Sequence, residues 1–147
     1  MTNNIHYPKI LVFLQFALIG LMLIFSSGVL HSPLALSVFS IGAILGVWAL
    51  NHNKLGNFNI QPKMKENAKL ITTGIYAYVR HPMYTSVLTM MLGILLSTSS
   101  LVEMILFLLL IGVLLLKAKR EESIWLKESE EYARYKKGTK FFIPFVL

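Results

Sequence analysis

The sequence lacks cysteine and aspartate, and it has few charged residues of either sign. Without cysteine there are no disulfide bonds, thiolate metal ligands or thiol nucleophiles. All seven acidic residues are glutamate, so no mechanism here can depend on an aspartate. Only 14% of the 147 residues are charged, whereas 55% are hydrophobic. So little charge cannot cover the surface of a small water-soluble fold, which excludes both a disordered chain and a soluble helical bundle.

Several common functional motifs are missing as well. The nine glycines form neither a GxGxxG nor a GxxxxGK[ST] pattern, and neither GxSxG nor HExxH occurs. The sequence therefore offers no case for a Rossmann cofactor site or a P-loop. The four histidines lie far apart, and no metal site is predicted. The net charge of +7 does not indicate nucleic-acid binding, because the cations flank apolar runs and do not alternate with exposed aromatic residues.

The charges that are present lie in blocks, and four apolar runs separate them. These runs cover roughly residues 8–27, 33–50, 82–97 and 101–116. About 20 helical residues cross ~30 Å of hydrocarbon. We therefore predict an all-α integral membrane protein with four transmembrane helices in two hairpins, residues 1–50 and 82–116. The first run is long and lacks a clear small-residue cleavage site, so it is predicted to remain as a span.

The positions of the charges predict the orientation. Of the 14 Lys and Arg residues, Lys9 lies at the start of the first run and the others lie in residues 51–81 or after Leu116, and only Glu103 among the charged residues lies on the other side. By the positive-inside rule, the N-terminus, the connecting segment 51–81 and the tail 117–147 face the cytoplasm. Residues 121–137 are predicted to form an amphipathic helix that continues the fourth span and ends at Gly138. The whole chain, 1–147, is expected to form one domain.

A GxxxG pattern in the second run and an Arg-His-Pro sequence at the third run bear on helix packing and on a possible site. Gly42 and Gly46 form a GxxxG, which favours close helix packing, within or between chains. Arg80 and His81 precede the third run, which begins at Pro82. Proline favours the first helical turn, so the third helix should begin close to Pro82, with free N–H groups beside Arg80 that suit a carboxylate or phosphate. The alternative is a membrane anchor, in which Arg80 reaches the headgroups and tyrosines form an aromatic belt.

A second polar block, residues 117–122, follows the fourth run and includes Glu121 and Glu122. Taken alone it could be a solvated charge run. However, each 16-residue helix of the second hairpin is ~24 Å long, so the chain returns to the depth at which it entered. Arg80 and His81 should therefore lie at the level of Glu121 and Glu122. Their convergence predicts a polar pocket at the membrane surface.

These residues resemble the isoprenylcysteine carboxyl methyltransferase and phospholipid methyltransferase superfamily. The likeness rests on LITTGIY at 70–76, RHPMY at 80–84, the Glu121–Glu122 pair, EEYARYKK at 130–137 and FFIP at 141–144. It covers residues 51–144 and implies an integral membrane enzyme that uses S-adenosylmethionine without a Rossmann domain. The cofactor pocket implied by the resemblance comprises Gln61, Ala68, Lys69, Leu70, Ile71, Tyr76, His81, Pro82, Met83, Tyr84, Glu121 and Glu122.

The resemblance also implies the catalytic candidates, which are Arg80, Lys117, Arg120 and Glu121. In the carboxyl-methylating branch an arginine one turn before the acidic pair orients the substrate carboxylate. Lys117 stands at that position here, with Arg120 nearby, and lysine is a poorer bidentate clamp. Carboxyl acceptors are therefore less favoured. The expected acceptor is a lipophilic or amphiphilic molecule that enters from the bilayer, and the methylated atom and oligomeric state are not predicted.

Two other functions are compatible with the sequence. Sterol-type reductases share a related C-terminal architecture but bind NADPH, so a cofactor titration would separate them from a methyltransferase. A non-catalytic lipid-binding membrane protein would instead tolerate replacement of Arg80 and Glu121 without loss of any ligand.

Overall fold

The computed structural model describes residues 6–57 and 69–142, and in these residues the fold is helical. The α-helices are α1 (His6–Phe25), α2 (Pro33–Asn57), α3 (Pro82–Thr98), α4 (Leu101–Glu128) and α5 (Glu130–Gly138). Two short 3-10 helices, η1 (Val29–His31) and η2 (Gly74–Ala77), lie in the connections. The all-helical prediction is confirmed.

Three helices are long and apolar enough to cross a membrane. Their apolar segments are Tyr7–Phe25 in α1, Pro33–Asn53 in α2 and Leu101–Glu128 in α4, whereas α3 is apolar but has only 17 residues. These helices indicate a multi-pass membrane protein. The 28 residues of α4 extend about 42 Å, which exceeds the ~30 Å hydrocarbon thickness. About 20 residues span that thickness, so the part of α4 from Glu121 onward extends beyond it.

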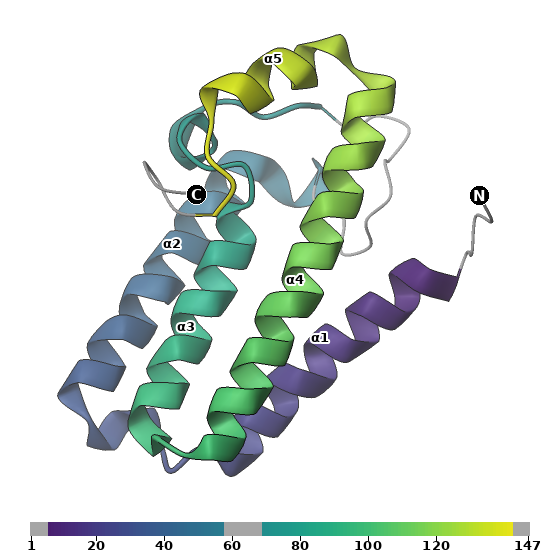
Figure 1. The fold of residues 1–147 in the computed structure, drawn as a ribbon. Coiled ribbons are helices and arrows are strands. Elements are labelled where there is room, and N and C mark those ends of the chain that lie inside the picture. Colours follow the sequence, from purple (N-terminus) through teal and green to yellow (C-terminus); the bar gives the residue numbers. More distant parts are fainter. Residues whose placement is uncertain (1–5, 58–68, 143–147) are drawn as a thin grey trace.

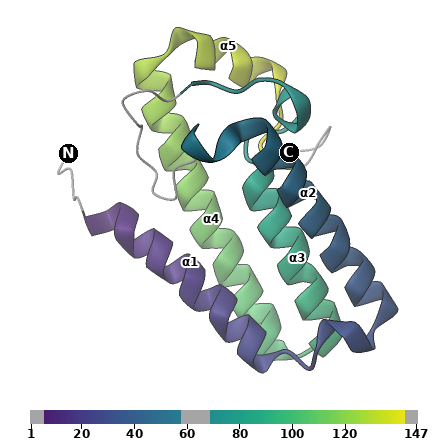
Figure 2. The ribbon, with the colours of Figure 1, turned by 180° about the vertical axis from the view of Figure 1, so that it is seen from behind.

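The helices pack in an order different from their order along the chain. The most extensive contacts join α2 to α3 and α1 to α4, and α3 also contacts α4. Figures 1 and 2 both show α1 beside α4 and leaning away from α2 at the end that carries α5. The helices of the predicted first hairpin, α1 and α2, therefore make their main contacts with α4 and α3 and not with each other. Each of the first two helices finds its partner in the second half of the chain.

Small residues explain why α2 packs on α3. A Cβ atom at Gly42 would lie 2.6 Å from the backbone nitrogen of Met90, and one at Gly46 would lie 2.6 Å from Oγ of Ser86. Ser86 Oγ donates a hydrogen bond of 2.7 Å to the carbonyl oxygen of Gly42. The predicted close packing at the GxxxG is confirmed, and the partner is α3 of the same chain.

One predicted helix boundary, the start of α3, agrees with the structure, whereas the predicted end of the fourth helix does not. Pro82 is the first residue of α3, as predicted, with His81 in the N-cap position. The predicted continuous helix over 121–137 is wrong, because α4 ends at Glu128 and α5 begins at Glu130. The side chain of Ser129 accepts a hydrogen bond from the backbone N–H of Tyr132, which caps α5. Figure 1 shows that α5 consequently turns from the end of α4 toward the side of α2 and α3.

Candidate active site

The segment that carries Arg80 and His81 is held by the C-terminal tail. The backbone N–H of Arg80 donates to the carbonyl of Lys140 at 2.8 Å, and that of His81 donates to the carbonyl of Phe141 at 3.2 Å. In return, the N–H of Lys140 donates to the carbonyl of Tyr78 at 3.0 Å. Together these bonds form a short parallel pairing that fixes the segment just before α3 begins.

The start of η2 requires a glycine. Gly74 has φ of +61°, and a Cβ there would lie 2.1 Å from the imidazole of His52 on α2. An L side chain would be strained in this backbone conformation and would also collide with the ring. Gly74 thus fixes how closely η2, and the tyrosine within it, approaches α2.

Glu122 is fully engaged by basic groups. Its side chain is 6% exposed, and its oxygens lie 2.6 Å from Arg80 Nε, 2.7 Å from Lys136 Nζ and 3.3 Å from His81 Nε2. Arg80 also donates to the carbonyl oxygens of Lys136 and Thr139. Burial opposes ionisation of Glu122, but the hydrogen bonds from His81, Lys136 and Arg80 outweigh it and lower the pKa to about 2. Glu122 is an ionised clamp that joins α4 to the Arg80 segment and the end of α5.

Glu121, the adjacent carboxylate, has fewer partners. The hydroxyl of Tyr84 donates to its Oε1 at 2.5 Å, and Nδ1 of His81 lies 3.6 Å from its Oε2. The Glu121 side chain is 23% exposed. Burial raises the pKa of Glu121, and the charge of Glu122 acts in the same direction. In the described part of the chain, Oε2 of Glu121 accepts no hydrogen bond, and its nearest basic group there is Nδ1 of His81 at 3.6 Å.

Tyrosines surround the two carboxylates and remain protonated. Burial raises the pKa of Tyr76 to about 12, although a hydrogen bond with Asn53 of α2 acts against it, and the charge of Glu121 raises it further. Tyr135 of α5 donates through its hydroxyl to the carbonyl of Tyr76 at 2.6 Å. Burial also holds the pKa of Tyr132 well above its ordinary value. These neutral side chains link α2, η2 and α5 around the acidic pair.

Lys117 is buried near the same carboxylates and is held by α1. It is 2% exposed, and its Nζ donates to Oε1 of Gln15 at 2.5 Å and lies 5.2 Å from the centroid of the Tyr84 ring. Gln15 itself is 8% exposed, and the sequence reasoning missed it. Its signal was available, because Gln15 is an amide within an uncharged apolar run and polar groups at membrane depth are functional candidates.

Comparison with known protein families shows which family this chain belongs to. A family model described as phospholipid methyltransferase matches residues 17–133. The chain belongs to the phospholipid methyltransferase family. The resemblance seen in the sequence is confirmed, and the chain is a member of the integral membrane methyltransferase superfamily. A search of the curated proteins finds no match to it. Because the match begins at residue 17, Gln15 lies just outside the family model.

The structure of this phospholipid methyltransferase family member brings most of the predicted site residues together. Arg80, His81, Tyr84, Glu121 and Glu122 are joined by the contacts above, and Lys117 adjoins them over the Tyr84 ring. The remaining predicted residues are more peripheral or not described. Ile71 and Met83 pack against the cluster that contains Tyr76, Leu70 is half-buried, Lys69 is exposed, and Gln61 and Ala68 lie outside the described residues.

Arg120, a predicted catalytic residue, is directed elsewhere. Its guanidinium lies 5.3 Å from the centroid of the Tyr7 ring on α1. Its Nε is buried and has no hydrogen-bond partner among the described residues. The structure therefore places Arg120 on the α1 side of α4, apart from the hydrogen bonds of Glu121 and Glu122.

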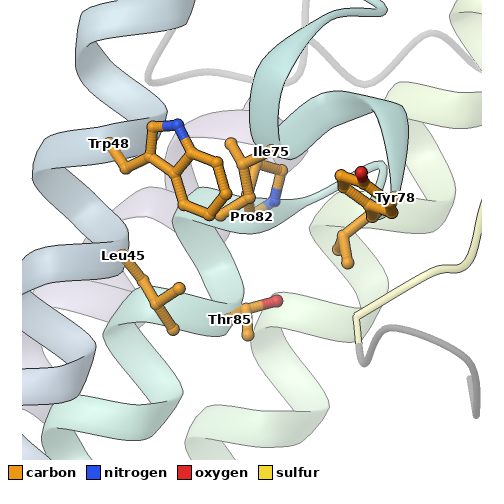
Figure 3. Close-up of a pocket in the computed structure, with 7 residues that line it drawn as sticks. Leu45, Trp48, Ile75, Tyr78, Pro82 and Thr85 are labelled. Atoms are coloured by element: carbon orange, nitrogen blue, oxygen red, sulfur yellow. The ribbon is translucent and has the colours of Figure 1, made fainter.

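An apolar pocket adjoins the ionic cluster in this family member (Figure 3). It has a volume of about 470 Å³ and is lined by Leu45, Trp48, Ile75, Tyr78, Val79, Pro82 and Thr85. Val79 and Pro82 bracket Arg80 and His81 in the sequence, so one wall of the pocket is the segment that holds the clamp. The hydroxyl of Thr85 already donates to the carbonyl of Phe142 at 2.7 Å. The lining suits an apolar chain and not a charged group.

Proposed function

We propose that this chain is an S-adenosylmethionine-dependent methyltransferase that acts at the cytoplasmic membrane surface on a lipophilic or amphiphilic acceptor. The observation that carries the proposal is the difference between the two adjacent carboxylates. Glu122 is saturated by basic groups, whereas Glu121 has an oxygen without a hydrogen bond in the described residues. A carboxylate held in this way suits the ammonium group of the methyl donor.

The donor set fits that cofactor. Glu121 would hold the amino group, and Tyr76 and Tyr84 would supply neutral aromatic surface near the sulfonium, which favours electron-rich neighbours. Ile71, Met83 and Pro82 would add apolar lining. Arg80 is committed to Glu122 and to two carbonyl groups, so we assign it a positioning role in place of the catalytic role expected from the sequence.

The chemistry requires placement more than it requires acid or base groups. S-adenosylmethionine supplies an activated methyl group: a lone pair of the acceptor forms a bond to the methyl carbon while the carbon–sulfur bond breaks, and the sulfonium becomes a neutral thioether. The protein's contribution is to hold donor and acceptor in line and to exclude water. The apolar part of the acceptor would fit the pocket lined by Leu45, Trp48 and Ile75.

We further propose that α3 crosses the membrane with α1, α2 and α4, and that both termini face the cytoplasm. At ~1.5 Å per residue, α3 covers about 25 Å, and a span somewhat shorter than the bilayer is tolerated by local thinning. The absence of cysteine makes single-cysteine labelling a direct test. A cysteine at Lys137 should react from the cytoplasmic side and one at Ser99 from the opposite side. The reverse labelling pattern would overturn the orientation.

Calorimetry with protein in lipid nanodiscs tests the cofactor. Wild type should bind S-adenosylmethionine in the micromolar range, and Glu121→Gln and His81→Ala should each abolish binding while the helical content is unchanged. Glu128→Gln is the control, because Glu128 lies on the exposed part of the same helix. Retained affinity in both site variants would refute the pocket. Binding of NADPH in place of S-adenosylmethionine would instead favour the reductase alternative.

The acceptor is best identified by its product. Incubation with methyl-labelled S-adenosylmethionine and a total extract of lipids and membrane proteins should transfer label to one class of amphiphilic molecule. If wild type binds the cofactor but labels nothing, the non-catalytic alternative gains support.

A further inference from the structure

Lys117 and Glu121 lie four residues apart on α4, which is the spacing of neighbouring side chains on one helix face. A lysine and a glutamate at this spacing are expected to form an ion pair, above all where water is scarce. Among the described residues, however, no Lys117–Glu121 ion pair is present. The Lys117 ammonium bonds to Gln15, and the Glu121 carboxylate accepts from Tyr84.

The partner that takes Lys117 is neutral and comes from another helix. Oε1 of Gln15 lies 2.5 Å from Lys117 Nζ, and both side chains are almost completely buried between α1 and α4. An amide accepts one hydrogen bond from the ammonium but leaves its positive charge in place. Gln15 therefore fixes where the ammonium points without neutralising it. Tyr84 contacts both groups, because its ring centroid lies 5.2 Å from Lys117 Nζ and its hydroxyl donates to Glu121.

We propose that Gln15 is a positioning residue that holds the Lys117 ammonium away from Glu121, which keeps the Glu121 carboxylate available to the ammonium group of the methyl donor. The inference rests on the proposed function and deepens it. If Lys117 paired with Glu121, the donor would have to displace a cation that is attached to the same helix. The cost of that displacement would appear as weaker cofactor binding.

A double-mutant cycle measured by calorimetry with S-adenosylmethionine in nanodiscs tests this role. Gln15→Leu should weaken binding about tenfold, because Lys117 is then free to pair with Glu121. Gln15→Leu combined with Lys117→Met should restore the affinity to within about threefold of wild type, because the competing cation is gone. Gln15→Glu should retain affinity, since a carboxylate still holds Lys117. Phe16→Leu, at an exposed neighbouring position on α1, is the matched control and should change nothing.

The outcomes separate this role from a structural one and from the proposed function itself. If wild type does not bind S-adenosylmethionine, the proposed function fails. If wild type binds and Gln15→Leu binds equally well, only the role of Gln15 fails. If the double variant binds as weakly as Gln15→Leu, the amide supports the fold and does not control Lys117, and the proposal is overturned.

If Gln15→Leu folds poorly, infrared spectroscopy of a second variant, measured without cofactor, still tests the proposal. Gln15→Met has nearly the same length and suits an apolar helix. In its infrared spectrum the carboxylate band of Glu121, assigned by its loss in Glu121→Gln, should shift as Lys117 pairs with it. The shift should disappear when Lys117→Met is added. An unchanged band in Gln15→Met would contradict the proposal.

Discussion

The α2–α3 half of the bundle and the α1–α4 half are held together by different interactions. Between α2 and α3 the contact is made by small residues, with one hydrogen bond from Ser86 to the Gly42 carbonyl. Between α1 and α4 a buried amide meets a buried lysine, and beyond it the end of α4 carries the Glu122 clamp. The α2–α3 half is mainly a scaffold, although His81 and Tyr84 at the start of α3 contact Glu121, and the α1–α4 half carries the carboxylates and the lysine that can recognise a charged ligand.

Within the α1–α4 half, we expect one of the two adjacent carboxylates to serve stability and the other to serve ligand binding. Glu122 binds three basic side chains, whereas among the described residues Oε2 of Glu121 accepts no hydrogen bond and only approaches His81 at 3.6 Å. Substitutions of two adjacent and chemically identical residues should therefore have different consequences. Changes at Glu122 should unfold the polar end, and changes at Glu121 should remove ligand binding from a folded protein.

The largest effect is expected from Glu122→Gln. Its side chain is 6% exposed, and the change would leave Arg80 and Lys136 without their anionic partner. Removing one member of a buried ion pair typically costs roughly 3–5 kcal/mol. Unfolding in detergent should show a loss of this order, and hydrogen exchange should become faster in α5. Glu128→Gln, on the exposed part of α4, serves as the control, and equal stability of the two variants would contradict the clamp.

Acid should weaken the same clamp reversibly. The pKa of Glu122 is lowered from 4.5 to about 2, so its ionised form contributes stability that is complete above about pH 4.5 and is lost as the pH falls toward 2. The shift corresponds to about 3 kcal/mol at most. Unfolding measured from pH 6 to pH 2 should show this loss in wild type and a flatter profile in Glu122→Gln. A wild-type profile as flat as that of the variant would show that the clamp does not form.

A smaller effect is expected from the scaffold half. Gly42→Leu would drive a side chain into the backbone of Met90, and overpacking of this kind costs about 1–3 kcal/mol. The melting temperature should fall. Gly112→Leu is the matched control, because no atom lies within 4 Å of a Cβ placed there. If both glycines tolerate leucine equally, close packing is not what holds α2 on α3.

The sequence predicted the parts of this structure that depend on local chemistry. The start of α3 at Pro82 follows from the fixed φ of proline, and the meeting of Arg80 with Glu122 follows from the matched lengths of the apolar runs 82–97 and 101–116. The helix break at Ser129 was also encoded, by a capping serine before two acidic residues. It was missed because amphipathic periodicity continues on both sides of the cap.

Partner choice could not be predicted in the same way. Apolar helices of similar length offer no sequence rule for pairing α2 with α3 and α1 with α4, because every such face is compatible with lipid and with another helix. The different roles of Glu121 and Glu122 were hidden for a related reason. Neighbours on a helix point about 100° apart, and only the surrounding elements decide which of them meets Arg80 and which faces Tyr84.

The smallest effect, and the sharpest separation of the two carboxylates, is expected from Tyr84→Phe. The change removes the hydroxyl that donates to Glu121 at 2.5 Å and keeps the ring near Lys117. Stability should change by about 1 kcal/mol or less. Because the lost hydrogen bond favoured the ionised carboxylate, the pKa of Glu121 should rise further, and the acid limit of S-adenosylmethionine binding should move to higher pH. Calorimetry as a function of pH measures that shift. An unmoved limit, with the acid dependence of stability also unchanged, would mean that Glu121 does not control cofactor binding.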